Sequence, residues 1–255
     1  MRFGALQYCL GKPATLFEVA GRIGLDGVEL GFGEPRDLTS EPETRAATRQ
    51  SADSAGLTIC SLMLGTLNQG GWSSDDAAVH DQATALVSAA IEAAAELGAG
   101  VVLVPFFFDA APKTAEQLAR VVDGFRGVTA AAEAAGVTLG YEGELPAAQV
   151  IELLDAIGSP AVGCYYDVGN ALWLGHDPVA EIRALGGRIC QVHIKEFGTK
   201  LSDCLLGEGS VPLPECVDAL AEIGFDGWCV LEVGTFRRAE ENTGRQLDYL
   251  KQFVD

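Results

Sequence analysis

The chain has 255 residues, and its 36 acidic residues against 17 Lys and Arg give a formal net charge of −19. Hydrophobic residues make up 48% of the chain and charged residues 21%, a composition that excludes a disordered protein. The large negative charge, without any cluster of basic residues, disfavours nucleic acid as a partner because phosphates would be repelled.

Eight apolar runs of strand length, rich in β-branched residues, recur along the chain and predict strands. They cover residues 2–9, 27–31, 57–64, 100–106, 137–142, 162–167, 189–195 and 227–232. Several of these runs are apolar on both faces, which is typical of parallel strands that are covered by helices.

The segments between these runs are rich in Ala and Glu, with apolar residues at helical spacing. The clearest predicted helices cover residues 76–98 and 114–135, and the loop-like segment 200–212 makes the seventh helix late and short. Eight strand–helix units of roughly 32 residues each predict a closed (β/α)8 TIM barrel rather than an open sheet. No Pro/Ser linker or charge block divides the chain, so we expect residues 1–255 to form one domain.

Seven scattered cysteines without a C-x-x-C pair predict buried, reduced thiols rather than zinc ligands. No apolar run approaches the roughly 20 residues that span a bilayer. The apolar stretch at residues 3–10 is too short for a secretory signal. We therefore expect a cytoplasmic protein with no membrane partner.

Polar side chains interrupt the last four predicted strands near their carboxyl ends. They are Glu142, Asp167, His193 and Glu232. In a (β/α)8 barrel the active site lies at this end, so we expect the four to meet there. Carboxylates and a neutral imidazole form a mixed ligand set for Mn²⁺, Mg²⁺, Co²⁺ or Zn²⁺, and a cation would relieve the repulsion between the carboxylates.

Each of the four residues also has an ordinary explanation when it is taken alone. Asp167 is placed to cap the turn that follows it, and His193 stands between apolar neighbours like a buried core histidine. Glu142 and Glu232 are also consistent with strand-end carboxylates that face water. All four at equivalent positions of successive strands favour the metal site.

These residues and their surroundings resemble the xylose isomerase-like TIM barrels, a superfamily of sugar (phosphate) isomerases and epimerases that also contains apurinic-site endonucleases and inosose dehydratases. The matching stretches lie at residues 25–33, 137–144, 162–171, 192–198, 206–220 and 225–234. The resemblance implies that Glu142, Asp167, His193 and Glu232 bind the metal. It also implies that Glu142 and Glu232 act as acid and base.

Further candidates for substrate binding are Glu29, Asn170, Trp173, Lys195 and Glu208. Glu29 matches a recurrent acidic position of the family that faces the pocket mouth; the alternative is a carboxylate that faces solvent or supports a metal ligand from behind. Asn170 stands where many members carry a His, which argues against a multinuclear metal site. Lys195 lies two residues beyond His193 on the same side of the strand, Glu208 lies in the GEG loop, and Trp173 follows the sixth strand. A solvated lysine, a turn residue and ordinary packing are the respective alternatives.

The resemblance and the ligand set predict a divalent-metal-dependent isomerase or epimerase of a small ketose or related hydroxy-ketone that works through an enediolate. A metal-dependent dehydratase of the inosose or dehydroshikimate type stays open, because it forms the same enolate. A non-catalytic sugar-binding barrel is less favoured. An AP-endonuclease-like phosphodiesterase is also less favoured, because the chain has only three His. Phosphorylation of the substrate stays open, since Arg237 and Arg238 follow the eighth strand, and so does assembly into a homo-oligomer.

Overall fold

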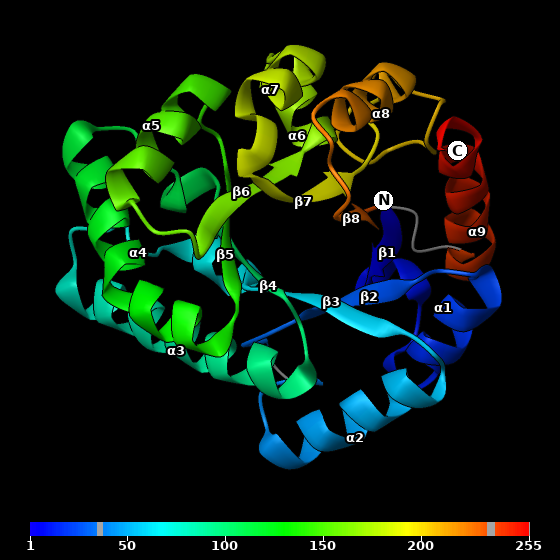
Figure 1. Ribbon diagram of the computed structural model, residues 1–255, viewed down its shortest axis with the longest axis horizontal. Coiled ribbons are helices and arrows are strands. Elements are labelled where there is room, and N and C mark those ends of the chain that lie inside the picture. The colour runs from blue at the N-terminus through cyan, green and yellow to red at the C-terminus, as the bar shows by residue number, and fades with distance from the viewer. Residues whose placement is uncertain (35–37, 234–237, 255) are drawn as a thin grey trace.

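Eight parallel strands close into a barrel in the computed structural model, which describes residues 1–34, 38–233 and 238–254 (Figure 1). Arg237 lies outside the described residues. The strands are β1 (Arg2–Leu6), β2 (Gly27–Gly31), β3 (Thr58–Met63), β4 (Val101–Phe106), β5 (Thr138–Gly143), β6 (Val162–Asp167), β7 (Ile189–Ile194) and β8 (Trp228–Leu231).

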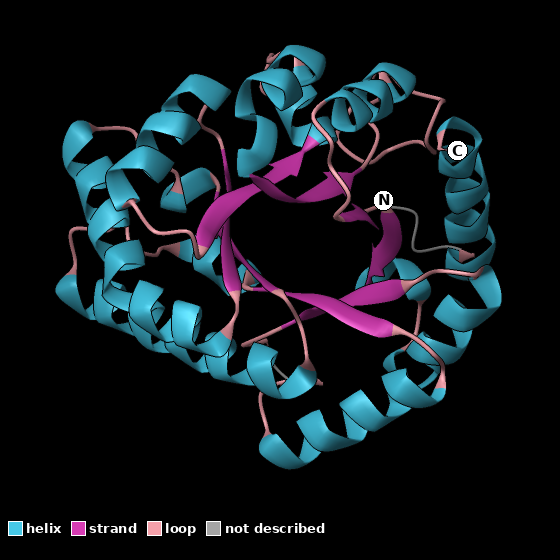
Figure 2. Cartoon of the chain, viewed as in Figure 1, coloured by secondary structure: helices cyan, strands magenta, loops and turns pink. Residues whose placement is uncertain are grey.

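The α-helices of the described part form a ring outside the strands (Figure 2). They are α1 (Leu16–Ile23), α2 (Pro42–Ser54), α3 (Ala77–Leu97), α4 (Ala115–Ala135), α5 (Ala147–Ile157), α6 (Val168–Trp173), α7 (Pro178–Leu185), α8 (Leu213–Glu222) and α9 (Ala239–Leu250). None of these helices is long and apolar enough to cross a membrane.

Neighbouring strands in the sequence pair in parallel throughout, and β8 pairs with β1 to close the ring. The predicted (β/α)8 barrel is therefore confirmed. Because all strands run the same way, their carboxyl ends meet at one end of the barrel. The strands predicted at 27–31 and 162–167 match β2 and β6. The helix that follows β7, labelled α8, begins late and is short, as expected of the seventh helix. The first predicted strand, 2–9, is too long, because the chain turns into a 3₁₀ helix at Gln7–Leu10.

Free thiols account for all seven cysteines, as predicted, and five of the seven are buried. Aromatic side chains of β4 and β5 and of the segment after β3 pack in the core outside the barrel. Trp72 is buried against the edge of Phe125, with ring centroids 4.9 Å apart, and Phe106 stacks on Tyr141 at 5.0 Å. This cluster joins the outside of the barrel to α4, so Trp72 serves the packing of the core.

A glycine on α4 makes room for the ring of Trp72. A Cβ on Gly124 would overlap the Cγ and Cδ2 atoms of that ring, whereas one on the exposed Gly127 of the same helix would meet nothing within 4 Å. We expect Gly124→Ala to lower the free energy of unfolding by about 2 kcal/mol through overpacking. We expect Gly127→Ala to raise it by about 0.5–1 kcal/mol through helix propensity. Urea unfolding checks both values, and equal effects of the two substitutions would contradict this packing.

Candidate metal centre

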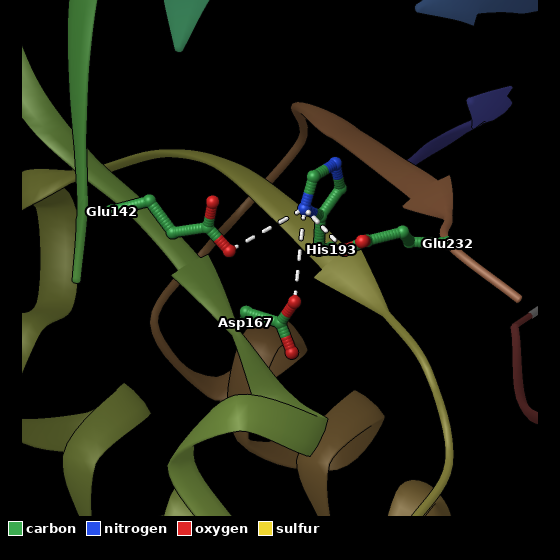
Figure 3. Close-up of side chains that lie close together, drawn as sticks. All are labelled: Glu142, Asp167, His193 and Glu232. Carbon is green, nitrogen blue, oxygen red and sulfur yellow. Dashed lines mark ion pairs between the residues drawn. The ribbon is translucent and has the colours of Figure 1, made fainter. Parts of the chain in front are cut away.

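The four polar residues that end the last four strands meet at the carboxyl end of the barrel (Figure 3). Each offers one ligand atom, and these atoms all lie within 4.8 Å of one another. Nδ1 of His193 lies 3.1 Å from Oε2 of Glu232, 3.5 Å from Oε1 of Glu142 and 3.7 Å from Oδ2 of Asp167. The expected convergence is therefore present.

The imidazole of His193 faces the three carboxylates with a nitrogen that lacks a hydrogen-bond partner among the described residues. This buried atom is Nδ1, whereas Nε2 lies 2.7 Å from Oε1 of Glu29. Distances of 3.1–3.7 Å from Nδ1 to the carboxylate oxygens match ligand atoms that share one cation with bonds of about 2.1 Å. The four side chains thus fit a divalent cation in position and in chemistry.

Asp167 serves two neighbours with its two carboxylate oxygens. Oδ1 accepts a hydrogen bond of 2.8 Å from the backbone N–H of Asn170 and caps α6, while Oδ2 lies 2.9 Å from Nζ of Lys195. The side chain of Asp167 can therefore cap α6 with one oxygen and offer the other to a cation. Burial raises the pKa of Asp167 to about 7, against the opposing effect of the Lys195 charge.

Lys195 brings a buried positive charge to the site. Its Nζ lies 2.6 Å from Oε2 of Glu232, in addition to its contact with Asp167. Burial disfavours the ammonium form, but the carboxylates of Asp167 and Glu232 outweigh it and raise the pKa of Lys195. Burial also opposes ionisation of Glu232, yet Lys195 and His193 lower the pKa of that carboxyl. Lys195 is thus a charged neighbour of two ligands.

A cavity of about 470 Å³ opens above these ligands. Glu142, His193 and Glu232 line it, whereas Asp167 is not part of its wall. The side chain of Glu232 is 30% exposed and that of Asp167 only 1%. A bound molecule therefore reaches the two glutamates, while the aspartate lies behind them.

Three of the predicted substrate-binding residues line this cavity: Asn170, Trp173 and Lys195. Asn170 is buried and donates from Nδ2 to Oε1 of Glu142 over 3.1 Å, so it also orients a ligand. Trp173 is 40% exposed and lines the cavity, as do Phe107 and Phe108.

Glu208 is not part of the cavity wall, so the structure does not bring it to the substrate site predicted for it. It is exposed, and its Oε2 accepts a hydrogen bond from the N–H of Leu205, which fits the alternative of a turn residue. The carboxylate that organises this loop is the buried Glu196, which accepts from the N–H groups of Gly207 at 2.9 Å and Val211 at 2.8 Å. These N–H groups of the loop therefore donate to Glu196 and not to a group in the cavity.

Glu29 lies behind His193 rather than at the pocket mouth. It has 0% exposure, does not line the cavity, and meets the imidazole on the side away from the three carboxylates. The structure therefore does not bring Glu29 to the cavity, and its position fits the alternative in which Glu29 supports a metal ligand from behind.

A polar layer that was not predicted from the sequence lies beneath the ligands; it is formed by Ser61, Tyr165 and Gln191. The signal was present in the spacing. Tyr165 precedes Asp167 by two residues, and Gln191 precedes His193 by two, so each pair shares a face of its strand. The register pairs Tyr165 with Gln191 and Asp167 with His193. Both pairs therefore point into the barrel, one layer above the other.

Comparison with known proteins gives consistent results. A family model described as xylose isomerase-like TIM barrel matches residues 17–253. A 2-epi-5-epi-valiolone 7-phosphate 2-epimerase of Actinoplanes sp. is 31% identical over 201 residues, which cover 76% of this chain and 72% of that protein. An L-ribulose-5-phosphate 3-epimerase of Escherichia coli is 26% identical, over 85% of this chain and 80% of that protein.

Solved structures with the same architecture include two ketose epimerases. A D-psicose 3-epimerase superposes with a TM-score of 0.84 at 19% identity, covering 100% of this chain and 99% of the other. A D-allulose 3-epimerase of Methylomonas sp., solved in complex with D-allulose, gives 0.83 at 17%, covering 100% and 97%. At these identities the two likenesses establish the shared fold.

Proposed function

The chain belongs to the xylose isomerase-like TIM barrel family, and from this premise we propose that it is a divalent-metal-dependent epimerase or isomerase of a small ketose. One observation carries the proposal. Two carboxylates line one cavity on either side of His193: Glu142 lies in β5, and Glu232 directly follows β8 (Figure 3). The names of the relatives, which are epimerases of ketose-like phosphates, support it.

Glu142, Asp167, His193 and Glu232 would hold the cation. When bound, a divalent cation supplies a Lewis acid that acidifies the C–H beside the substrate ketone and stabilises the enediolate charge. All four side chains come from strand ends, so the barrel fixes their positions before substrate binds.

Glu142 and Glu232 are the proposed acid and base. Epimerisation requires that one group removes a proton from one face of the carbon and that another returns a proton to the opposite face. Asn170 orients the carboxylate of Glu142, and Lys195 orients that of Glu232. Asp167 is excluded from this role because it does not line the cavity, so it serves as a ligand only.

The remaining wall of the cavity suits a polyhydroxy chain. The ammonium of Lys195 is placed to donate a hydrogen bond to a substrate oxygen, and the apolar faces of Trp173 and Phe108 suit the C–H faces of a sugar. Both side chains are exposed, Phe108 at 62%, which leaves their rings accessible to a ligand.

A panel of ketopentoses and ketohexoses, free and as phosphate esters, tests this function in D₂O with the cation-loaded protein. We expect one ketose to be converted to its epimer or isomer, with one deuterium incorporated at the carbon beside the ketone. An ultraviolet-absorbing enone would identify a dehydratase instead. Binding of a ketose without conversion or deuterium incorporation would contradict an enzymatic role.

A further inference from the structure

A fully buried carboxylate, that of Glu29, lies beneath the candidate metal centre. Glu29 has 0% exposure, and among the described residues no Lys or Arg forms an ion pair with it. Its Oε1 lies 2.7 Å from Nε2 of His193, and its Oε2 lies 2.6 Å from Oγ of Ser61 and 2.8 Å from the hydroxyl of Tyr165. Burying a carboxylate is costly unless a positive charge or several donors compensate it.

The hydrogen bonds around Glu29 all run toward it. The amide Nε2 of Gln191 donates to Oγ of Ser61 at 2.6 Å and to the hydroxyl of Tyr165 at 2.9 Å. Each hydroxyl therefore directs its own hydrogen at Glu29. Because the carboxylate accepts from every neighbour, Nε2 of His193 is the nitrogen that carries hydrogen toward it. In the neutral imidazole, which is the form that binds a cation, the lone pair of Nδ1 is then the one aimed at the three carboxylates.

We propose that Glu29 is a positioning residue for the cation, acting through His193. Its carboxylate fixes the Nε2–H form of the imidazole, holds the ring with Nδ1 toward the other ligands, and opposes the cation's charge from the far side of the ring. Ser61, Tyr165 and Gln191 hold the carboxylate in place. The inference rests on the proposed function only in that it requires a cation at this site.

Substitution of the charge alone provides the test. Glu29→Gln keeps an oxygen that accepts from Nε2 but removes the negative charge, whereas Ser61→Ala removes one donor to the same carboxylate and leaves its charge. We expect the Kd for Mn²⁺, measured from the electron paramagnetic resonance signal of free Mn²⁺, to rise about 10–100-fold in Glu29→Gln. We expect a clearly smaller rise in Ser61→Ala. A rise below fivefold in Glu29→Gln, or equal rises in both variants, would overturn the proposal.

Nitrogen NMR of the wild-type chain tests the same proposal without any substitution. The chain has only three His, so ¹⁵N-labelled imidazoles give few signals. We expect His193 in the Zn²⁺-loaded protein to carry its proton on Nε2, and a proton on Nδ1 would overturn the inference. If the wild-type chain binds no cation, the proposed metal site is wrong and this inference falls with it. If wild type and Glu29→Gln bind Mn²⁺ equally, the inference alone is wrong.

Discussion

Glu232→Gln is expected to lower kcat at least about a thousandfold on the ketose substrate when the variant is saturated with Mn²⁺. The glutamine keeps an oxygen that can face the cation, but it cannot accept a proton from carbon. Glu232 is the more exposed of the two glutamates, 30% against 8% for the side chain of Glu142, so its loss acts directly on the substrate. Metal analysis of the variant separates loss of the base from loss of the ligand.

The paired variant Glu142→Gln sharpens this test. Each single variant keeps one base, so we expect each to exchange the reacting hydrogen of one epimer with D₂O and to leave the other epimer unlabelled. The two variants should select opposite epimers. Glu208→Gln is the matched control, because Glu208 is exposed and does not line the cavity, and it should keep the wild-type kcat. Near-normal epimerisation by Glu232→Gln, or exchange of the same epimer by both variants, would rule out the assignment.

Removal of the cation is expected to abolish turnover, and addition of Mn²⁺, Mg²⁺ or Co²⁺ should restore it. Cation binding must also displace protons. Burial raises the pKa of Asp167 to about 7, and for His193 the charges of Glu29 and Glu232 outweigh the opposing effect of burial and raise the pKa. Both groups therefore hold protons more tightly in the metal-free chain, so lower pH favours the metal-free form.

Because cation binding releases protons, the Kd for the cation should rise as the pH falls, and calorimetry can measure this dependence. Each displaced proton should raise the Kd for Mn²⁺ about tenfold for each unit of falling pH, so the dependence should be steeper below pH 7, where Asp167 also holds a proton, than above it. Release of a proton in buffers of different ionisation enthalpy gives the number displaced. Turnover that survives exhaustive chelation, or a Kd that is constant between about pH 6 and 8, would contradict the metal site.

The barrel could be predicted from sequence because parallel strands that are buried on both faces leave continuous apolar runs, as in Val101–Phe106. The four ligands were also visible, since a carboxylate or imidazole at the end of such a run is conspicuous. Glu142 and His193 lie within strands, so the direction of each strand determines at which end of the barrel the side chain lies.

The direction of Glu29 could not be predicted in the same way. Its strand pairs with β3 through a register shift between Val28 and Glu29, so residue spacing alone does not tell at which depth the side chain enters the barrel. The roles of the loop residues could not be predicted from the sequence either. Glu196 and Glu208 are chemically identical, and only the folded loop turns the first toward its backbone N–H groups and leaves the second in solvent.

Anomalous diffraction from crystals soaked in Mn²⁺ tests the central claim most directly. One peak per chain is expected between the carboxylates of Glu142, Asp167 and Glu232, at about 2.1 Å from Nδ1 of His193. The absence of a peak in this place, or a cation bound elsewhere on the chain, would contradict the account.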